Sequence, residues 1–124
     1  MMVMSDCIFC KIVAGEIPSY KIYEDEKYLA FLDIFPSAEG HTLVIPKQHV
    51  DWVWDSENLG EYFEVVGKIA RHYRVISKDI VRSNIDGWQV QHAHIHLKIG
   101  KVNNLNPKEG EATELQSTAD KYRL

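Results

Sequence analysis

The spacing of apolar residues along the chain predicts one long amphipathic helix among several short β-strands. In the middle of the chain, apolar side chains recur every three or four positions, which is typical of a helix that buries one face. We expect this helix to begin after Asp55 or Ser56, either of which can cap its first turn, and to end near Ser77. The residues that define the apolar stripe are Leu59, Tyr62, Phe63, Val66, Ile69, Ala70 and Tyr73.

Shorter apolar runs on both sides of this helix predict β-strands. The first two runs are rich in β-prone side chains and are joined by four charged residues, so they predict a hairpin. The third is a continuous apolar run that Pro46 closes, and the last follows the turn formers Asp86 and Gly87. The predicted strands are residues 19–24, 28–32, 42–45, 79–84 and 88–99.

Both ends of the chain predict further helices. Residues 7–14 predict a short helix, with Asp6 as its N-cap and Gly15 at its C-terminal end. Residues 101–110 contain three Asn, a Pro and a Gly, so they predict a loop or a mobile flap. Residues 111–124 then predict a C-terminal helix.

The length and composition indicate one ordinary globular domain. The chain has 124 residues, which is enough for a single core of modest size and too few for two. About five antiparallel strands, one long helix, a short N-terminal helix and a C-terminal helix define an α+β fold. We expect a single domain over residues 1–124, with its core in residues 7–99 and a loop plus helix in residues 100–124.

Charge and hydropathy narrow the range of functions. The net charge of −4 argues against binding to a nucleic-acid polymer, although a local pocket can still bind a small anion. The sequence has no apolar run of membrane-spanning length and no signal-peptide pattern, so we expect a cytoplasmic protein without membrane contact. Cys7 and Cys10 are too close in sequence to join distant segments, which favours reduced thiols or metal ligands.

Three histidines alternate with apolar residues in the last predicted strand. Because side chains alternate along a strand, His92, His94 and His96 share one face and lie about 6.6 Å apart. Imidazoles at this spacing can bind a zinc ion that keeps an open position for water. Alternatively, a neutral imidazole can attack phosphorus while its neighbours neutralise the phosphoryl charge. The residues that alternate with them, and that we expect to face the core, are Ala93, Ile95, Leu97 and Ile99.

Five segments in a fixed order resemble the histidine-triad (HIT) superfamily, specifically its Hint-like branch of nucleoside phosphoramidate hydrolases. The resemblance extends from Cys7 to Ile99 and is strongest where the triad combines with His41 and residues 33–34. It implies a HIT-like fold and a hydrolase that cleaves small nucleotides at the α-phosphate through a covalent nucleotidyl-histidine. The segments are Glu16-Ile17-Pro18, Tyr23-Glu24-Asp25, Leu29-Ala30-Phe31-Leu32-Asp33-Ile34, Gly40-His41-Thr42-Leu43-Val44-Ile45-Pro46-Lys47 and His92-x-His94-x-His96.

The resemblance also implies roles for individual residues. His94 matches the nucleophile of the family, and His96 and His41 match the histidines that contact the phosphate. Asp33 matches the carboxylate that accepts hydrogen bonds from the ribose hydroxyls. The other expected substrate contacts are Ile34, Phe9 and Ile12 around the base, and Asn84 and Gln89 near the phosphate.

The same resemblance implies a structural zinc ion and a dimer. In superfamily members with the same pair of cysteines, the residues at these positions resemble a Cys₂His₂ zinc site. The ligands of such a site here would be Cys7, Cys10, His49 and His92. Four protein ligands leave no open position, so this zinc would hold the fold together and would not be required for catalysis. Family members usually pair as homodimers that extend the sheet across a two-fold axis.

Two positions before the triad depart from the family pattern and keep several functions open. Trp88 stands where the family usually has glutamine, and Gln89 stands where it usually has a hydroxyl. Gln89 can donate to a phosphoryl oxygen but cannot relay a proton as a hydroxyl can, which leaves the leaving group undefined. The alternatives are a dinucleoside polyphosphate hydrolase, a nucleotidyl transferase, a zinc hydrolase with the triad as ligands, and a catalytically silent nucleotide-binding module.

Overall fold

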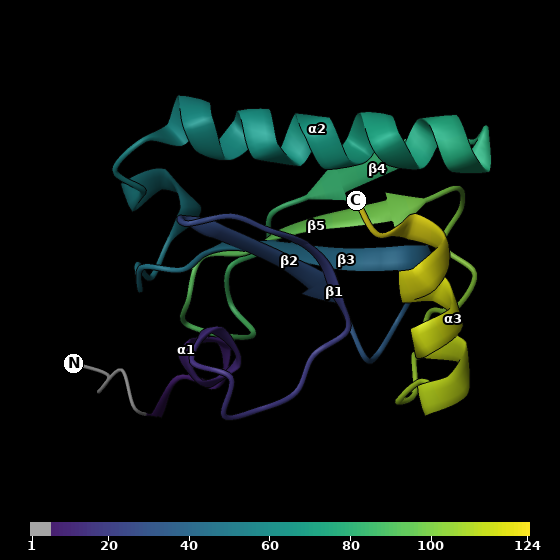
Figure 1. Ribbon diagram of the computed structural model, residues 1–124, viewed down its shortest axis with the longest axis horizontal. Helices are drawn as coiled ribbons and strands as arrows, with labels where there is room; N and C mark the ends of the chain where they lie inside the picture. Colours follow the sequence, from purple (N-terminus) through teal and green to yellow (C-terminus); the bar gives the residue numbers. More distant parts are fainter. Residues whose placement is uncertain (1–5) are drawn as a thin grey trace.

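A five-stranded antiparallel sheet lies at the centre of the computed structural model, which describes residues 6–124 (Figure 1). The strand order is β1-β2-β3-β5-β4, and every neighbouring pair is antiparallel. The hairpin predicted at the start of the chain is therefore present as β1 and β2. The strands are β1 (Lys21–Glu24), β2 (Tyr28–Leu32), β3 (Glu39–Pro46), β4 (Val81–Asn84) and β5 (Ile95–Ile99).

Three helices surround the sheet. The long helix α2 (Leu59–Ser77) crosses one face, and the short helix α1 (Ile8–Val13) lies on the opposite side (Figure 1). The C-terminal helix α3 (Ala112–Tyr122) packs beside α2 and against β1 and β3. This arrangement confirms the predicted α+β fold, with its five strands and its long, N-terminal and C-terminal helices.

The sheet separates two apolar cores, and β2 contributes to both of them. Its alternate residues Tyr28, Ala30 and Leu32 join the larger core under α2. Leu29 and Phe31 point the other way, into a smaller core that α1 covers. Because both faces of the strand are covered, all five of its residues are buried. The same alternation turns Ala93, Ile95, Leu97 and Ile99 into the larger core, as predicted.

The long helix begins later than the sequence suggests. Asn58 is its N-cap, and the Asn58 side chain accepts a hydrogen bond from the main-chain N–H of Glu61 at 2.9 Å. The predicted caps, Asp55 and Ser56, belong instead to a short 3₁₀ turn and its end. The predicted apolar stripe includes Phe63, but this side chain is 41% exposed because it lies about 100° around the helix from the fully buried Tyr62.

The predicted strand over residues 88–99 is also too long. Regular pairing begins only at Ile95, so His92 and His94 lie in the segment that leads into β5 and only His96 lies within the strand. At the N-terminus, Cys7 and not Asp6 caps α1, because the Cys7 sulfur accepts the N–H of Cys10 at 3.4 Å. No helix in residues 6–124 is both long and apolar enough to cross a membrane.

Candidate catalytic site and metal centre

Four histidines gather on the face of the sheet that is turned away from α2. His41 and His96 come from the neighbouring strands β3 and β5, and they point opposite to the core residues beside them. His92 and His94 come from the segment before β5, which is tied to the rest of the fold by a bond of 2.7 Å from the N–H of Ala93 to the carbonyl of Val50. All four side chains are buried, with at most 5% exposure.

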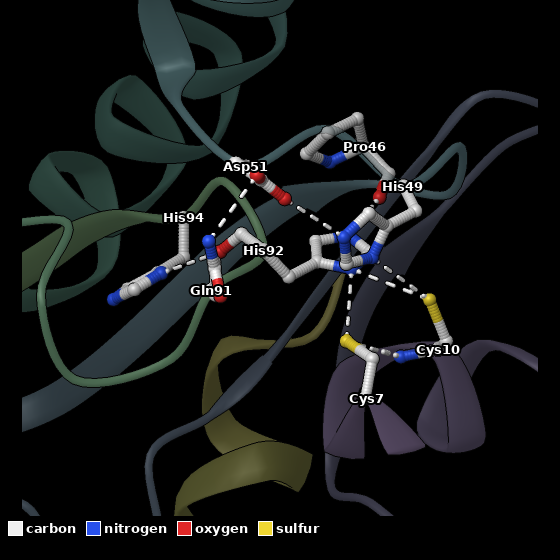
Figure 2. Close-up of polar contacts among 8 residues, drawn as sticks. All are labelled: Cys7, Cys10, Pro46, His49, Asp51, Gln91, His92 and His94. Carbon is white, nitrogen blue, oxygen red and sulfur yellow. Dashed lines mark hydrogen bonds and ion pairs between the residues drawn. The ribbon is translucent and has the colours of Figure 1, made fainter. Parts of the chain in front are cut away.

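The environment of His94 leaves one ring nitrogen available. Its Nδ1 lies 2.8 Å from the main-chain oxygen of His92, which can only accept a hydrogen bond (Figure 2). The proton of neutral His94 is therefore on Nδ1, and Nε2 carries the free lone pair. The ring of Phe9 packs edge-on against His94 at a centroid distance of 5.4 Å, which holds the imidazole plane.

The proton positions of His41 and His96 follow from a main-chain donor. The N–H of Ser37 donates to His41 Nδ1 at 3.1 Å, so the proton of neutral His41 is on Nε2. His41 Nε2 lies 2.9 Å from His96 Nδ1, which must then accept. The proton of His96 is consequently on Nε2, a buried atom without a hydrogen-bond partner among the described residues.

Burial keeps both of these histidines neutral at ordinary pH. Desolvation, with a smaller contribution from neighbouring positive charge, lowers the pKa of His41 to about 3 and that of His96 to about 4. Burial has the opposite effect on an acid and raises the pKa of Asp33. Asp33 accepts the N–H of Phe35 at 2.8 Å, and its other oxygen lies 3.5 Å from His41 Nε2. This carboxylate thus shapes a turn and also faces the histidines.

A pocket of about 250 Å³ opens beside the triad, between α1 and the end of β2. Its walls are mostly apolar, with a few polar side chains among them, which is the usual character of a small-molecule site. Asn84 does not line this pocket; its side-chain amide donates to Asp86 at 2.9 Å. Of the residues singled out from the sequence, those that line the pocket are Phe9, Ile12, Asp33, Ile34, Gln89, His94 and His96.

A second cluster brings together the two cysteines and two histidines. His92 Nδ1 lies 3.3 Å from the Cys7 sulfur and 3.5 Å from the Cys10 sulfur, and His49 Nδ1 lies 3.3 Å from the Cys10 sulfur (Figure 2). Tetrahedral zinc with ordinary Zn–S and Zn–N bonds would place such atoms about 3.5 Å apart. Burial, with a further effect of Cys7, raises the pKa of the Cys10 thiol to about 11, so a Cys10 thiolate here requires a nearby cation.

The outer contacts of this cluster also suit a metal ion. His92 Nε2 donates to the carbonyl of Pro46 at 2.8 Å, and His49 Nε2 donates to Asp51 at 3.0 Å (Figure 2). Both rings are therefore held with an unprotonated Nδ1 facing the cysteines, as is usual for metal-binding histidines. The donor set, its spacing and these outer contacts fit a four-coordinate zinc ion.

Asp33, His41 and His96 form a second group of potential ligand atoms. The Ser37 amide makes His41 Nδ1 an acceptor, so the Nε2 atom that faces the group carries a proton. A protonated nitrogen cannot bind a metal ion. We therefore interpret this group as a hydrogen-bonded chain.

Three further residues of the site were not found from the sequence. Ser37 contacts His41 Nδ1 through its main-chain N–H at 3.1 Å, which no side-chain pattern reveals, and its hydroxyl lies 3.4 Å from the same atom. Asp86 lies 3.9 Å from His96 Nε2, whereas its position before Gly87 predicts only a turn former. Asp51 follows His49 by two residues, and this spacing of a carboxylate from a candidate ligand could have revealed it.

The fold and the two histidine clusters together define a small α+β domain with a buried triad beside a ligand pocket. The model of the HIT domain matches residues 14–103 of this chain. The chain therefore belongs to the HIT family, and the resemblance seen in the sequence is confirmed.

Individual relatives agree with this assignment. Protein hit of Bacillus subtilis is 47% identical over 100 residues, covering 74% of this chain and 69% of the relative. The adenosine 5'-monophosphoramidase HNT1 of Saccharomyces cerevisiae is 40% identical over 95 residues, covering 73% of this chain and 60% of the yeast protein. The crystal structure of a zinc-bound histidine triad family protein from Mycobacterium smegmatis is similar with a TM-score of 0.80 and 31% identity, covering 98% of this chain and 93% of that one.

Proposed function

We propose that this chain, a hydrolase of the HIT family, cleaves small nucleotides at the α-phosphate through a covalent nucleotidyl-His94 intermediate. The observation that carries the proposal is the contact of 2.8 Å between His94 Nδ1 and the carbonyl of His92. It leaves the His94 Nε2 lone pair free on a residue that lines the pocket. The similarity to the yeast adenosine 5'-monophosphoramidase supports purine nucleoside phosphoramidates as substrates.

The reaction proceeds in two displacements at phosphorus. In the first, His94 Nε2 attacks the α-phosphorus and the bond from phosphorus to the leaving amine breaks, while the amine takes up a proton from solvent. In the second, water attacks the phosphorus, the bond to His94 breaks, and the nucleoside monophosphate is released as His94 returns to its neutral form. The N–H of His96 Nε2, which is buried without a partner among the described residues, donates to a phosphoryl oxygen in both steps.

The pocket supplies the binding contacts. Asp33 accepts hydrogen bonds from the ribose hydroxyls, and the apolar residues Phe9, Ile12 and Ile34 surround the base. Gln89 lies at the pocket beside His94 and donates to the phosphate. Asn84 does not line the pocket. It lies at the end of β4, opposite His96 in the neighbouring strand, and we propose that it contacts the phosphate from there.

We further propose that Cys7, Cys10, His49 and His92 bind a structural zinc ion. The spacing of the four donor atoms and the zinc-bound relative from Mycobacterium smegmatis support this assignment. Such an ion, when bound, clamps α1 to the segment that carries the triad and takes no part in the chemistry. A catalytic zinc ion held by the triad is disfavoured. His94 Nδ1 is bonded to the carbonyl of His92, and His92 Nε2 is bonded to the carbonyl of Pro46, so the two rings do not present free nitrogens to one common ion.

The partner of this site is a small nucleotide. The homodimer and the cytoplasmic location remain predictions, and sedimentation of the purified protein measures the former. The dinucleoside polyphosphate hydrolase and the nucleotidyl transferase use the same nucleophile and differ in the leaving group or acceptor, so comparing adenosine phosphoramidate with a diadenosine polyphosphate distinguishes the first of them.

The test is to trap the intermediate. The protein is mixed with an adenosine phosphoramidate, quenched without acid and weighed intact by mass spectrometry. We expect the mass of one adenylyl group added to the wild type and not to His94→Ala. A zinc assay in parallel should show that His94→Ala retains its metal and that Cys7→Ser loses it. Turnover that survives in His94→Ala contradicts the mechanism, and nucleotide binding without turnover or adduct indicates a silent binding module.

A further inference from the structure

The segment between β5 and α3 is tied to the loop that precedes His41. The main-chain N–H groups of Asn103 and Asn104 donate to the carbonyl of Ser37 at 2.9 and 3.3 Å. Further along, the N–H of Gly110 donates to the carbonyl of Ile34 at 2.7 Å. Three main-chain bonds thus connect residues 103–110, most of which lie beyond the matched HIT region, to the loop that follows Asp33.

Side-chain packing does not replace these bonds. A cavity of about 190 Å³ lies between the loop and the C-terminal segment, and Asp33, His41, Asn103 and Leu115 are among the residues on its walls. Atoms across a cavity have no contact partners, so the loop is held on this side by hydrogen bonds instead of by a filled core. Asn103 lines this cavity, and its N–H makes the shorter of the two hydrogen bonds to the Ser37 carbonyl.

The position of Ser37 determines where His41 and His96 carry their protons. Its N–H donates to His41 Nδ1, which puts the His41 proton on Nε2 and, across the contact of 2.9 Å, the His96 proton on Nε2. The Ser37 hydroxyl also lies 3.4 Å from His41 Nδ1, so if Ser37 moved away both contacts would be lost and His41 could carry its proton on either nitrogen. His96 would then place its proton on Nδ1 in part of the molecules and would lose its donor toward the pocket.

We propose that Asn103 is a positioning residue whose main-chain N–H holds Ser37 so that the protons of His41 and His96 stay on their Nε2 atoms. This inference rests on the proposed function, in which His96 Nε2–H donates to the phosphoryl group. Asn103 touches neither substrate nor reacting atoms and acts only through Ser37. The side chain of Asn103 is not involved, so the test must remove the main-chain donor.

The test replaces Asn103 with proline, which has no N–H. The control is Leu105→Pro in the same segment, because Leu105 is 88% exposed and its N–H has no hydrogen-bond partner in the described chain. Long-range ¹H–¹⁵N correlation spectra of the imidazoles report which nitrogen is protonated, and His41→Asn and His96→Gln assign the signals. Turnover of an adenosine phosphoramidate gives kcat and KM for each variant.

We expect the wild type and Leu105→Pro to show both protons on Nε2 and the same kcat. Asn103→Pro should show a mixture of tautomers at His41 and His96, with kcat lower by roughly three- to tenfold, the equivalent of one hydrogen bond, and little change in KM. Equal losses in the two proline variants, or unchanged tautomers in Asn103→Pro, overturn the proposal.

The wild-type spectrum keeps the proposal testable even if Asn103→Pro does not fold. Protonation of His41 on Nδ1 in the wild type overturns it directly. The tautomer measurement needs no substrate and therefore tests this inference independently of turnover. An inactive wild type would count against the proposed function, while the spectra would still decide this inference.

Discussion

The buried pair His41 and His96 should make the stability of the protein fall in mild acid. In the unfolded chain each histidine takes up a proton near pH 6.5. In the folded protein, burial lowers the pKa of His41 to about 3 and that of His96 to about 4. Between these limits the unfolded state binds more protons than the folded state, so the free energy of unfolding decreases as the pH falls.

The size of the effect follows from the two pKa values. The contribution of the pair is complete above pH 6.5, is lost as the pH falls toward 4, and does not change further below about 3. Between pH 7 and pH 5 each histidine should lower the free energy of unfolding by about 2 kcal/mol, or about 4 kcal/mol for the pair. Both side chains are at most 5% exposed, so solvent screening reduces this little.

Urea unfolding of the wild type and of His41→Asn at pH 7 and pH 5 measures this effect. Other titrating groups, including those of the Cys/His cluster, are common to both proteins and cancel in the comparison. Removing His41 should reduce the loss between the two pH values by about 2 kcal/mol. If the variant loses as much stability as the wild type, then His41 takes up its proton equally in both states and the reasoning from burial is wrong.

Three other substitutions test separate contacts. Asp51→Asn should weaken zinc binding 10- to 100-fold in competition with a chelator, because the carboxylate orients His49, a proposed zinc ligand. Asp33→Asn keeps the turn to Phe35 but weakens the proposed acceptor for the ribose hydroxyls, so KM should rise roughly tenfold, with no such rise for a 2′,3′-dideoxy substrate. Gly87→Ala should destabilise the fold by about 1–3 kcal/mol more than Gly15→Ala in urea unfolding. Both glycines have φ of +80°, but only a Cβ at Gly87 meets the Trp52 ring, at 2.6 Å.

The alternation of residues determined how much of the fold could be predicted. Side chains alternate in any extended segment, so the pattern around the triad correctly separated core residues from histidines. It did not predict where pairing begins, because β4 is only four residues long and gives β5 no partner before His96. The start of α2 was missed for a similar reason, since Asp55, Ser56 and Asn58 are all acceptable caps and packing decides among them.

The arrangement of the site was less accessible than the identity of its residues. A pattern of side chains indicates which histidines gather, but the position of each proton depends on main-chain groups. The carbonyl of His92 sets the tautomer of His94, and the amide of Ser37 sets that of His41. Such groups are present at every residue, so their use at one position is visible only after the chain has folded.

His92 connects the two clusters in a way that their separate descriptions conceal. Its ring faces Cys7 at 3.3 Å and is fixed from behind by the carbonyl of Pro46, while its own carbonyl holds His94 Nδ1 at 2.8 Å. A displacement of residue 92 therefore moves both the ring that faces Cys7 and the main-chain acceptor that keeps the lone pair of His94 on Nε2. Cys7 caps α1, and Phe9, whose ring packs on His94, lies within it, so the same short helix constrains His94 twice. The cluster of cysteines and histidines thus does more than stabilise the N-terminus, because it also constrains the geometry of His94, the proposed nucleophile, without entering the proposed reaction.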